Sequence, residues 1–366
     1  MEISGSDSLK KIKVGRYLII LVIIILLIIL ANKLGIRRES IIVITNEINL
    51  KNAYKRDYKL YNNEIAIAEK TKIQMMEFSG NQKWEKSVDN KKIYLANSGI
   101  YEYDFSGIIE KDDLEDGKFK WAIDLGANIQ WIKEEGNYLF VISKEKNNGT
   151  LGIVIDIETG TPILNKTFEN EQLIKLGIIG KNFYGTTLRM GQENLYSNFY
   201  EMNDKGDFLV QKNFEQEVLI KTEAISKHEI LIYTDEKIYL MKDSVDVWEY
   251  SLSDTIIDYD YDSKNKVITL IKSKNPTHIE KVSIKDEMVT SVNIDDELYK
   301  NIKIDNSMFH IGNKNIYKVD GSNNIYKMYM FDSKYYDVEV NKNVGLIVYK
   351  DYIQLIKLTH KITGGK

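Results

Sequence analysis

The 366-residue chain contains no cysteine. Disulfide bonds, thiolate nucleophiles, zinc–thiolate sites, haem attachment and a lipoprotein cysteine are therefore excluded. An exported bacterial domain and a cytosolic domain can both do without disulfides, so this absence limits the chemistry more than the compartment. Proline is nearly as scarce, with only Pro162 and Pro276, and no stretch rich in proline, glycine and serine divides the chain.

Clustered positive charge is missing from most of the chain. Residues 1–38 contain seven Lys and Arg against two acidic residues, whereas the remainder contains 43 Lys and Arg against 52 Asp and Glu. Proteins that bind nucleic acid need clustered cations to displace the counterions of the phosphates. A mildly acidic domain of this kind is not expected to bind nucleic acid.

The basic N-terminal segment surrounds one long apolar run. Tyr17 to Ala31 reads YLIILVIIILLIILA, without a charge or a polar amide, and an α-helix of that length spans about 22 Å. Val14 and Leu34 extend it toward the hydrocarbon thickness of a bilayer, about 30 Å. A cleaved signal peptide would need a small-x-small site after the run, which the sequence Ala-Asn-Lys lacks. A buried core helix would not be apolar on all sides. The sequence predicts a retained membrane anchor.

The anchor divides the chain into four predicted parts. These are a basic cytoplasmic tail (1–16), a transmembrane helix (17–34), a short linker (35–40) and a β-domain (41–366). The excess of cations before the helix is slight, but a long domain after a helix is translocated largely regardless of charge. We therefore expect a single-pass protein with its N-terminus in the cytoplasm and the large domain outside.

After the anchor, the hydrophobic period becomes two, as in β-strands. Seven hairpin turns then recur at a mean spacing of about 40 residues, which with four short strands per unit is typical of β-propeller blades. In the full form, a turn glycine with positive φ is followed four residues later by a large residue that returns to the buried face. The pairs are Gly80 and Trp84, Gly117 and Trp121, Gly160 and Leu164, Gly206 and Val210, and Gly321 and Ile325; weaker copies are Ser244 with Trp248 and Asp286 with Thr290.

An eighth unit is cut short at the C-terminus. Residues 345–358 supply two strands, and the chain ends where the next turn is due. An unassigned strand, 41–50, follows the anchor. Pairing this strand with the last blade would remove both exposed edges. The sequence therefore predicts an all-β propeller of eight blades closed by its N-terminal strand, with seven blades as the alternative.

Two segments resemble the repeats of quinoprotein-like (PQQ-like) propellers, in which an apolar strand precedes D-x-x-T-G-x-x-x-W. They are QMMEFSGNQKWEKSV and GIVIDIETGTPILNKTF, and 156–160 comes nearest to the full motif. The layout of a basic tail, one span and a divergent propeller resembles uncharacterised single-span membrane proteins of Gram-positive firmicutes. The resemblance implies the fold and assigns no activity. Quinoprotein alcohol dehydrogenases have adjacent cysteines beside the cofactor and calcium in the channel; this chain has no cysteine and no matching acid–amide set, so we predict no cofactor.

An acidic segment has the one-three-five spacing of a calcium loop, at Asp258, Asp260 and Asp262. Its sixth position is Ser263, where glycine is needed, and its twelfth is Thr269, where a bidentate glutamate is needed. A polar strand ending in a turn explains the pattern better. The acidic run 110–116 is predicted to be a solvated hairpin loop.

The remaining candidate residues form no catalytic or metal-binding pattern, so no catalytic, cofactor or metal site is predicted. The histidines have no HxH or HExxH spacing. They are His228, His278, His310 and His360, of which His310 lies in a predicted strand. Tyrosine pairs can line binding rims but are also good strand formers. They are Tyr101 and Tyr103, Tyr259 and Tyr261, and Tyr335 and Tyr336.

The architecture favours a membrane-tethered interaction module over an enzyme. Its expected partners are the membrane and an envelope protein, peptide or glycan. The alternative is a propeller hydrolase or lyase with its site at the channel mouth. Converging acidic and histidine side chains would favour the enzyme, and an apolar or aromatic groove would favour the interaction module.

Overall fold

The computed structural model describes residues 37–144, 149–191, 195–273, 276–304 and 307–363. These residues fall into two compact units, 44–356 and a smaller unit made of 37–43 and 357–363. The predicted tail and transmembrane helix lie outside the described residues. Within the described residues, no helix has the length and apolarity needed to cross a membrane. Arg37 to Ser40, which we expected in a linker, belong to the first strand.

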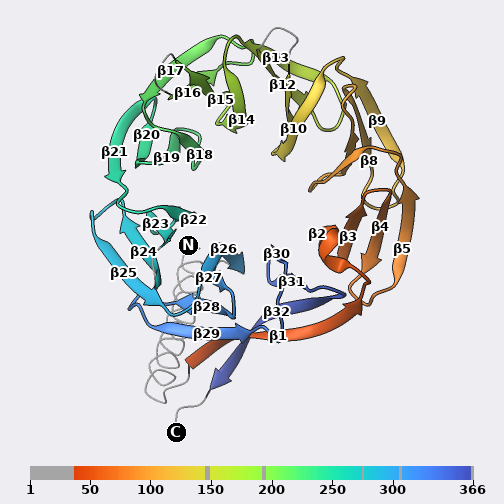
Figure 1. Cartoon of the computed structure of the whole chain (residues 1–366), viewed down its shortest axis with the longest axis vertical. Coiled ribbons are helices and arrows are strands. Elements are labelled where there is room, and N and C mark those ends of the chain that lie inside the picture. Colours follow the sequence, from red (N-terminus) through yellow and green to blue (C-terminus); the bar gives the residue numbers. More distant parts are fainter. Residues whose placement is uncertain (1–36, 145–148, 192–194, 274–275, 305–306, 364–366) are drawn as a thin grey trace, which may run out of the picture. The chain divides into compact units, whose positions relative to one another are not determined.

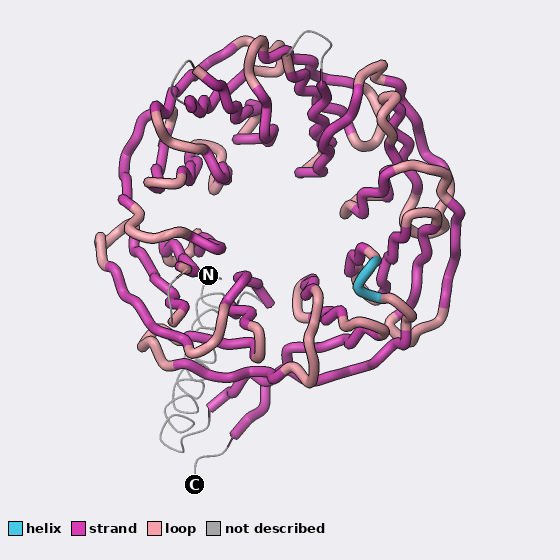
Figure 2. Tube along the Cα trace, viewed as in Figure 1, coloured by secondary structure: helices cyan, strands magenta, loops and turns pink. Residues whose placement is uncertain are grey.

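The described residues are almost entirely β-structure, with one single-turn 3-10 helix at Ala53–Lys55 (Figure 2). Seven successive four-stranded antiparallel sheets follow one another along the chain as blades. Blades 1 to 4 are β2 (Asp57–Leu60), β3 (Glu64–Glu69), β4 (Lys72–Glu77) and β5 (Gln82–Ser87); β6 (Lys92–Leu95), β7 (Ile100–Tyr103), β8 (Ile108–Asp112) and β9 (Phe119–Asp124); β10 (Asn128–Glu135), β11 (Tyr138–Lys144), β12 (Thr150–Asp156) and β13 (Pro162–Phe168); and β14 (Gln172–Ile179), β15 (Asn182–Met190), β16 (Leu195–Met202) and β17 (Phe208–Glu215).

Blades 5 to 7 repeat the same order, and an eighth sheet takes strands from both ends of the chain. Blades 5 to 7 are β18 (Leu219–Ala224), β19 (Glu229–Thr234), β20 (Lys237–Lys242) and β21 (Val245–Ser251); β22 (Ile256–Asp262), β23 (Val267–Lys272), β24 (Thr277–Ser283) and β25 (Val289–Ile294); and β26 (Leu298–Ile304), β27 (Ser307–Gly312), β28 (Asn315–Val319) and β29 (Ile325–Met330). Blade 8 is β30 (Asp337–Asn341), β31 (Val344–Val348), β32 (Tyr352–Thr363) and β1 (Arg37–Asn49). The prediction of eight blades is confirmed, and the seven-blade alternative is wrong.

Residues 44–356 form a ring in which the first strand of each blade lies innermost and the fourth outermost (Figure 1). The middle strands are buried on both faces; in β3, for example, all four residues from Ile65 to Ala68 are buried. Outer strands such as β5 alternate between half-buried and exposed residues. Both faces of a middle strand are covered because each blade packs between two neighbours, which explains the loss of simple alternation there.

The predicted turns all connect the third and fourth strands of a blade. Gly80, Gly117, Gly160 and Gly206 have positive φ as expected, and so does Ser244. In the last of the seven turns the positive φ belongs to Asn323 rather than to Gly321. The side chain of Ile325 there is 41% exposed, so our prediction that it returns to the core is wrong.

Glycine at two of these turns also permits adjacent blades to approach closely. A Cβ atom on Gly117 would lie 2.9 Å from the Trp84 ring of the preceding blade, and one on Gly160 would lie 2.7 Å from the Trp121 ring. Each indole then donates to a carbonyl of the same turn region: Trp84 Nε1 to Leu114 O at 3.2 Å, and Trp121 Nε1 to a carbonyl at 2.9 Å. The repeated glycine–tryptophan spacing therefore joins one blade to the next.

The N-terminal strand closes the ring as predicted. Thr45 Oγ1 donates to Leu355 O at 3.2 Å, and Leu50 N donates to Asp351 O at 2.9 Å. Ile48 is buried in an apolar cluster that contains residues of both blade 8 and blade 1. The first strand therefore completes the last blade and also packs on the first.

Antiparallel pairing gives the ring two distinct faces. Turns between the first and second strands, and between the third and fourth, lie on one face, which we call the hairpin face. Turns between the second and third strands, and the connections from one blade to the next, lie on the other, which we call the connection face.

Candidate functional site

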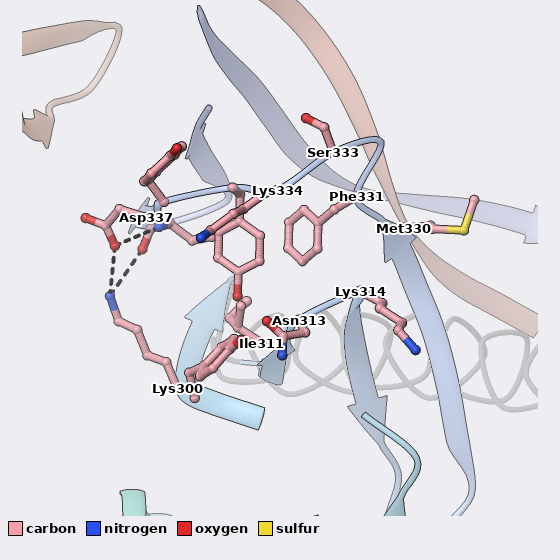
Figure 3. Close-up of a pocket in the computed structure, with 13 residues that line it drawn as sticks. Lys300, Ile311, Asn313, Lys314, Met330, Phe331, Ser333, Lys334 and Asp337 are labelled. Atoms are coloured by element: carbon pink, nitrogen blue, oxygen red, sulfur yellow. Dashed lines mark hydrogen bonds and ion pairs between the residues drawn. The ribbon is translucent and has the colours of Figure 1, made fainter. Parts of the chain in front are cut away.

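A groove opens on the connection face between blades 7 and 8 (Figure 3). It has a volume of about 790 Å³, within the range of roughly 300–1,000 Å³ that is usual for ligand sites. The groove is lined by Tyr299, Lys300, Ile311, Asn313, Lys314, Met330, Phe331, Ser333, Lys334, Tyr335, Tyr336, Asp337 and Val338. We call it the blade 7–8 groove.

Its wall is the connection from β29 to β30, which three hydrogen bonds hold in place. Phe331 N donates to Lys314 O at 3.0 Å, and Tyr336 N donates to Val348 O at 2.7 Å. The Tyr335 hydroxyl donates to Gly312 O at 3.0 Å. The connection is thus anchored to both blades, so the groove has a preformed wall.

Aromatic and apolar side chains dominate the groove. The rings of Phe331 and Tyr335 stack with their centroids 4.1 Å apart. Met330 is 69% exposed and Tyr336 is 44% exposed. Burial raises the pKa of the Tyr335 hydroxyl, which therefore stays a neutral hydrogen-bond donor. The groove presents an apolar surface with polar atoms at its edge, as Tyr-rich binding sites do.

Three lysines and one carboxylate supply the charge of the groove. Lys300 lies 3.9 Å from Asp337 Oδ1 and donates to Val338 O at 3.2 Å, at one end of the groove (Figure 3). Lys314 and Lys334 are exposed, and neither forms an ion pair with a carboxylate of the described residues. The groove therefore carries a local excess of positive charge.

The tyrosine pairs that the sequence singled out have different environments. Tyr335 and Tyr336 line the groove. Tyr101 is fully buried, and Tyr259 and Tyr261 lie in the core between blades 5 and 6. Tyr103 is half-buried at the end of β7, and of the three pairs the third is the one that lines the groove.

The aspartates with calcium-loop spacing all lie in β22, where each has a structural partner. Asp258 accepts from Asn301 N at 2.5 Å, and Asp260 forms an ion pair with Lys303 at 2.6 Å. Asp262 accepts from the backbone of the turn at Lys264 at 3.0 Å. Burial raises the pKa of Asp258 and of Asp260. Across the part of the chain that the structure describes, no three acidic or histidine side chains gather to hold a metal ion.

His310 is buried in β27, with its Nδ1 2.7 Å from Asn301 Oδ1. Burial, assisted by the charge of Lys281, lowers its pKa to about 3, so the ring is neutral at physiological pH. His278 is buried in β24. His360 lies near the end of β32, and its side chain falls outside the description.

A second cavity, of about 650 Å³, opens on the hairpin face. Its lining includes a serine, a histidine and an aspartate, the residue types of a Ser-His-Asp hydrolase. His228 Nδ1 lies 2.9 Å from Asp243 Oδ1. Ser244 Oγ, however, donates to Glu201 Oε2 at 3.3 Å. Among the described residues, no hydrogen bond joins Ser244 to His228, so the nucleophile–base contact that acyl transfer requires is missing.

The acidic run 110–116 spans the end of β8 and the β8–β9 hairpin. Asp113 and Asp116 accept from backbone N–H groups of the turn, as expected for a solvated loop. Lys111 and Asp112, however, are buried, so the prediction of a fully solvated run is wrong. Packing of the blades buries Asp112, and an ion pair with Lys86 of the preceding blade compensates for its lost hydration.

Sequence reasoning missed acidic residues that hold the connections between blades. The Glu171 carboxylate accepts hydrogen bonds from the hydroxyls of Thr187 and Tyr200 in blade 4. In blade 5, the Glu217 carboxylate accepts from the hydroxyls of Thr234 and Tyr239. In blade 7 the corresponding acid is Asp296, which accepts a hydrogen bond from the Tyr317 hydroxyl. Each acid stands two residues before a buried leucine of the inner strand, namely Leu173, Leu219 and Leu298. That spacing is the signal that could have revealed them.

Comparison with known proteins identifies the fold. No family model and no curated protein matches the sequence. Among solved structures, BamB from Moraxella catarrhalis is similar with a TM-score of 0.60 and 9% identity, covering 87% of this chain and 100% of its own. The Dos1 propeller has a TM-score of 0.61 and 9% identity, with 86% and 95% covered. The quinohemoprotein alcohol dehydrogenase from Comamonas testosteroni has a TM-score of 0.58 and 7% identity, with 89% and 77% covered. The chain is a β-propeller, a fold that it shares with BamB, the Dos1 propeller and a quinoprotein.

Proposed function

We propose that the protein is a membrane-anchored, extracytoplasmic interaction module that binds an envelope protein through the blade 7–8 groove. The aromatic groove is the observation that carries this proposal, because an aromatic groove was the feature expected of an interaction module. The propeller fold agrees with it, since such a ring presents loops on a rigid scaffold. At the hairpin-face cavity, Ser244 donates to Glu201 rather than to His228 among the described residues, so this cavity lends the hydrolase alternative no support.

The membrane anchor rests on the apolar run within 17–34 and on the basic residues around it. The resemblance to single-span firmicute proteins agrees with this part of the proposal. The same arrangement would place residues 1–16 in the cytoplasm and the propeller outside.

The absence of cysteine makes the topology directly testable. We expect Ser322→Cys, in an exposed turn, to react with a membrane-impermeant maleimide on intact cells, and Ser8→Cys to react only after permeabilisation. The native protein should also retain its N-terminal segment, which mass spectrometry measures. Labelling of Ser8→Cys on intact cells, or a mature start beyond Ala31, would contradict the anchor and its orientation.

Binding at the groove is tested by site-specific photocrosslinking in native membranes. A benzoylphenylalanine at Tyr336 should give a discrete heavier adduct, because this ring is exposed at the groove. The matched control is Phe119, which is 61% exposed and lies at the hairpin face of blade 2. No adduct at Tyr336, or the same adducts from both positions, would show that the groove is not the binding surface.

A further inference from the structure

The groove is a positive site on an acidic domain. The segment after residue 38 has more acidic than basic residues, yet the groove contains three lysines and only Asp337. Opposite charges attract over about 8–10 Å at physiological salt, so the local cations, rather than the net charge, decide what enters. The lysines at the groove therefore favour a ligand with carboxylates.

Two acidic side chains, Asp296 and Glu297, precede the groove-lining Tyr299 and already have hydrogen-bond partners. Asp296 accepts from the backbone N–H groups of Lys314 and Asn315, at 3.0 and 3.2 Å, and from the Tyr317 hydroxyl. Glu297 accepts from Asn313 at 2.7 Å. These acids hold the rim of the groove and leave the ammonium groups of Lys314 and Lys334 without an acidic partner among the described residues.

The groove is also complementary to a ligand that has an apolar group beside its carboxylate. Lys334 Nζ lies 5.8 Å from the centroid of the Tyr336 ring, so cation and aromatic surface are adjacent. Phe331 and Tyr335 continue this surface inward. A ligand that satisfies both features carries acidic and aromatic groups a few ångströms apart.

The neighbouring strand favours an extended peptide as that ligand. β29 is the last strand of its sheet, and no described strand pairs with its outer edge. It ends at Met330, which lines the groove. A peptide can add to such an edge through main-chain hydrogen bonds while its side chains enter an adjacent groove.

We infer that the blade 7–8 groove binds an extended acidic peptide segment, with a carboxylate against Lys314 and Lys334 and an aromatic side chain against Phe331 and Tyr336. This inference rests on the proposed function and specifies the chemistry of the partner.

The test uses the full chain in detergent and fluorescein-labelled octapeptides measured by fluorescence anisotropy. An alternating Glu-Tyr peptide should bind, and its affinity should fall with salt. The Gln-Tyr peptide should bind the wild type with an affinity at least about tenfold lower. The Glu-Tyr peptide should lose at least as much affinity for the double variant Lys314→Glu/Lys334→Glu. The double variant Lys181→Glu/Lys227→Glu makes the same charge change at exposed lysines of the hairpin-face cavity and should bind like the wild type.

Equal binding of the Glu-Tyr and Gln-Tyr peptides, equal loss in both double variants, or no binding of the Glu-Tyr peptide would overturn the inference. The proposed function is judged separately by the Tyr336 crosslink. A Tyr336 adduct without acidic-peptide binding would leave the interaction module in place and reject only the acidic partner.

Discussion

Deleting residues 41–50 is expected to abolish the cooperative unfolding of the propeller. These residues form most of the outer strand of blade 8, and Ile48 packs in a cluster that blades 8 and 1 share. Without them, β32 becomes an open edge and the junction between the last and first blades loses apolar contacts. Thermal unfolding followed by circular dichroism should show a broad transition or aggregation.

Two controls separate closure from a general effect of truncation. Deleting residues 1–38 leaves the residues of β1 that pack in the ring and should preserve a single sharp transition. In the full chain, Ile48→Ala should cost about 2–4 kcal/mol of unfolding free energy, because Ile48 is buried. Ile44→Ala, on the same strand, should change it by less than about 0.5 kcal/mol, because Ile44 is 50% exposed. A sharp transition after deletion of 41–50 would mean that the ring does not depend on this strand.

The blades were predictable because their signals are local. A hairpin needs positive φ within a few residues of sequence, and the glycines at Gly80, Gly117, Gly160 and Gly206 supply it. Closure of the ring was predictable because the last blade lacks a strand and an unassigned strand stands near the N-terminus. In the turn of blade 7, the glycine pattern identified the turn correctly. It assigned the positive φ to Gly321, however, whereas Asn323 has it.

The groove was only half predictable, because burial depends on where each strand lies in the ring. Tyr259 and Tyr335 belong to equally prominent tyrosine pairs in the sequence. The first lies on an inner strand and is covered by the neighbouring blade, whereas the second lies in a connection that faces the groove. No local pattern states which connection leaves space between two blades, so the groove's lysines could not have been chosen from the sequence.

Nothing in the sequence indicated the ion pairs that Lys86, whose side chain is 32% exposed, forms with two buried acids of the next blade. Lys86 is on β5, and its partners Glu102 and Asp112 are on β7 and β8 of the next blade. The lysine meets the acids only because adjacent blades pack face to face. Sequence analysis placed Asp112 in a solvated run because nothing local indicates that contact.

Lys86→Met is expected to cost about 3 kcal/mol of unfolding free energy at pH 7, because removing one partner leaves buried carboxylates without their counter-charge. Lys86 Nζ lies 2.7 Å from Glu102 Oε1 and 2.5 Å from Asp112 Oδ2, and the two acids are 3% and 1% exposed. The control is Lys83→Met on the same strand. Lys83 pairs with Glu64, which is much more exposed than Glu102, so this variant should unfold nearly like the wild type. Guanidinium unfolding measures both.

The pH dependence of that loss identifies its cause. Burial raises the pKa of Glu102, Lys86 opposes this rise, and the adjacent Asp112 adds to it. A carboxyl group whose pKa is raised in the folded state is favoured in its protonated form. The stability it contributes is complete below the unfolded pKa, about 4.3, and is lost as the pH rises through the folded pKa. Removing Lys86 should raise that pKa further, so the deficit of Lys86→Met should be largest near pH 7–8 and smallest near pH 4. Adding Glu102→Gln and Asp112→Asn to Lys86→Met should remove most of the pH dependence, since no buried acid is left to ionise. A deficit that stays constant across this range would assign the loss to packing of the lysine stem and would show that the charge pair contributes little.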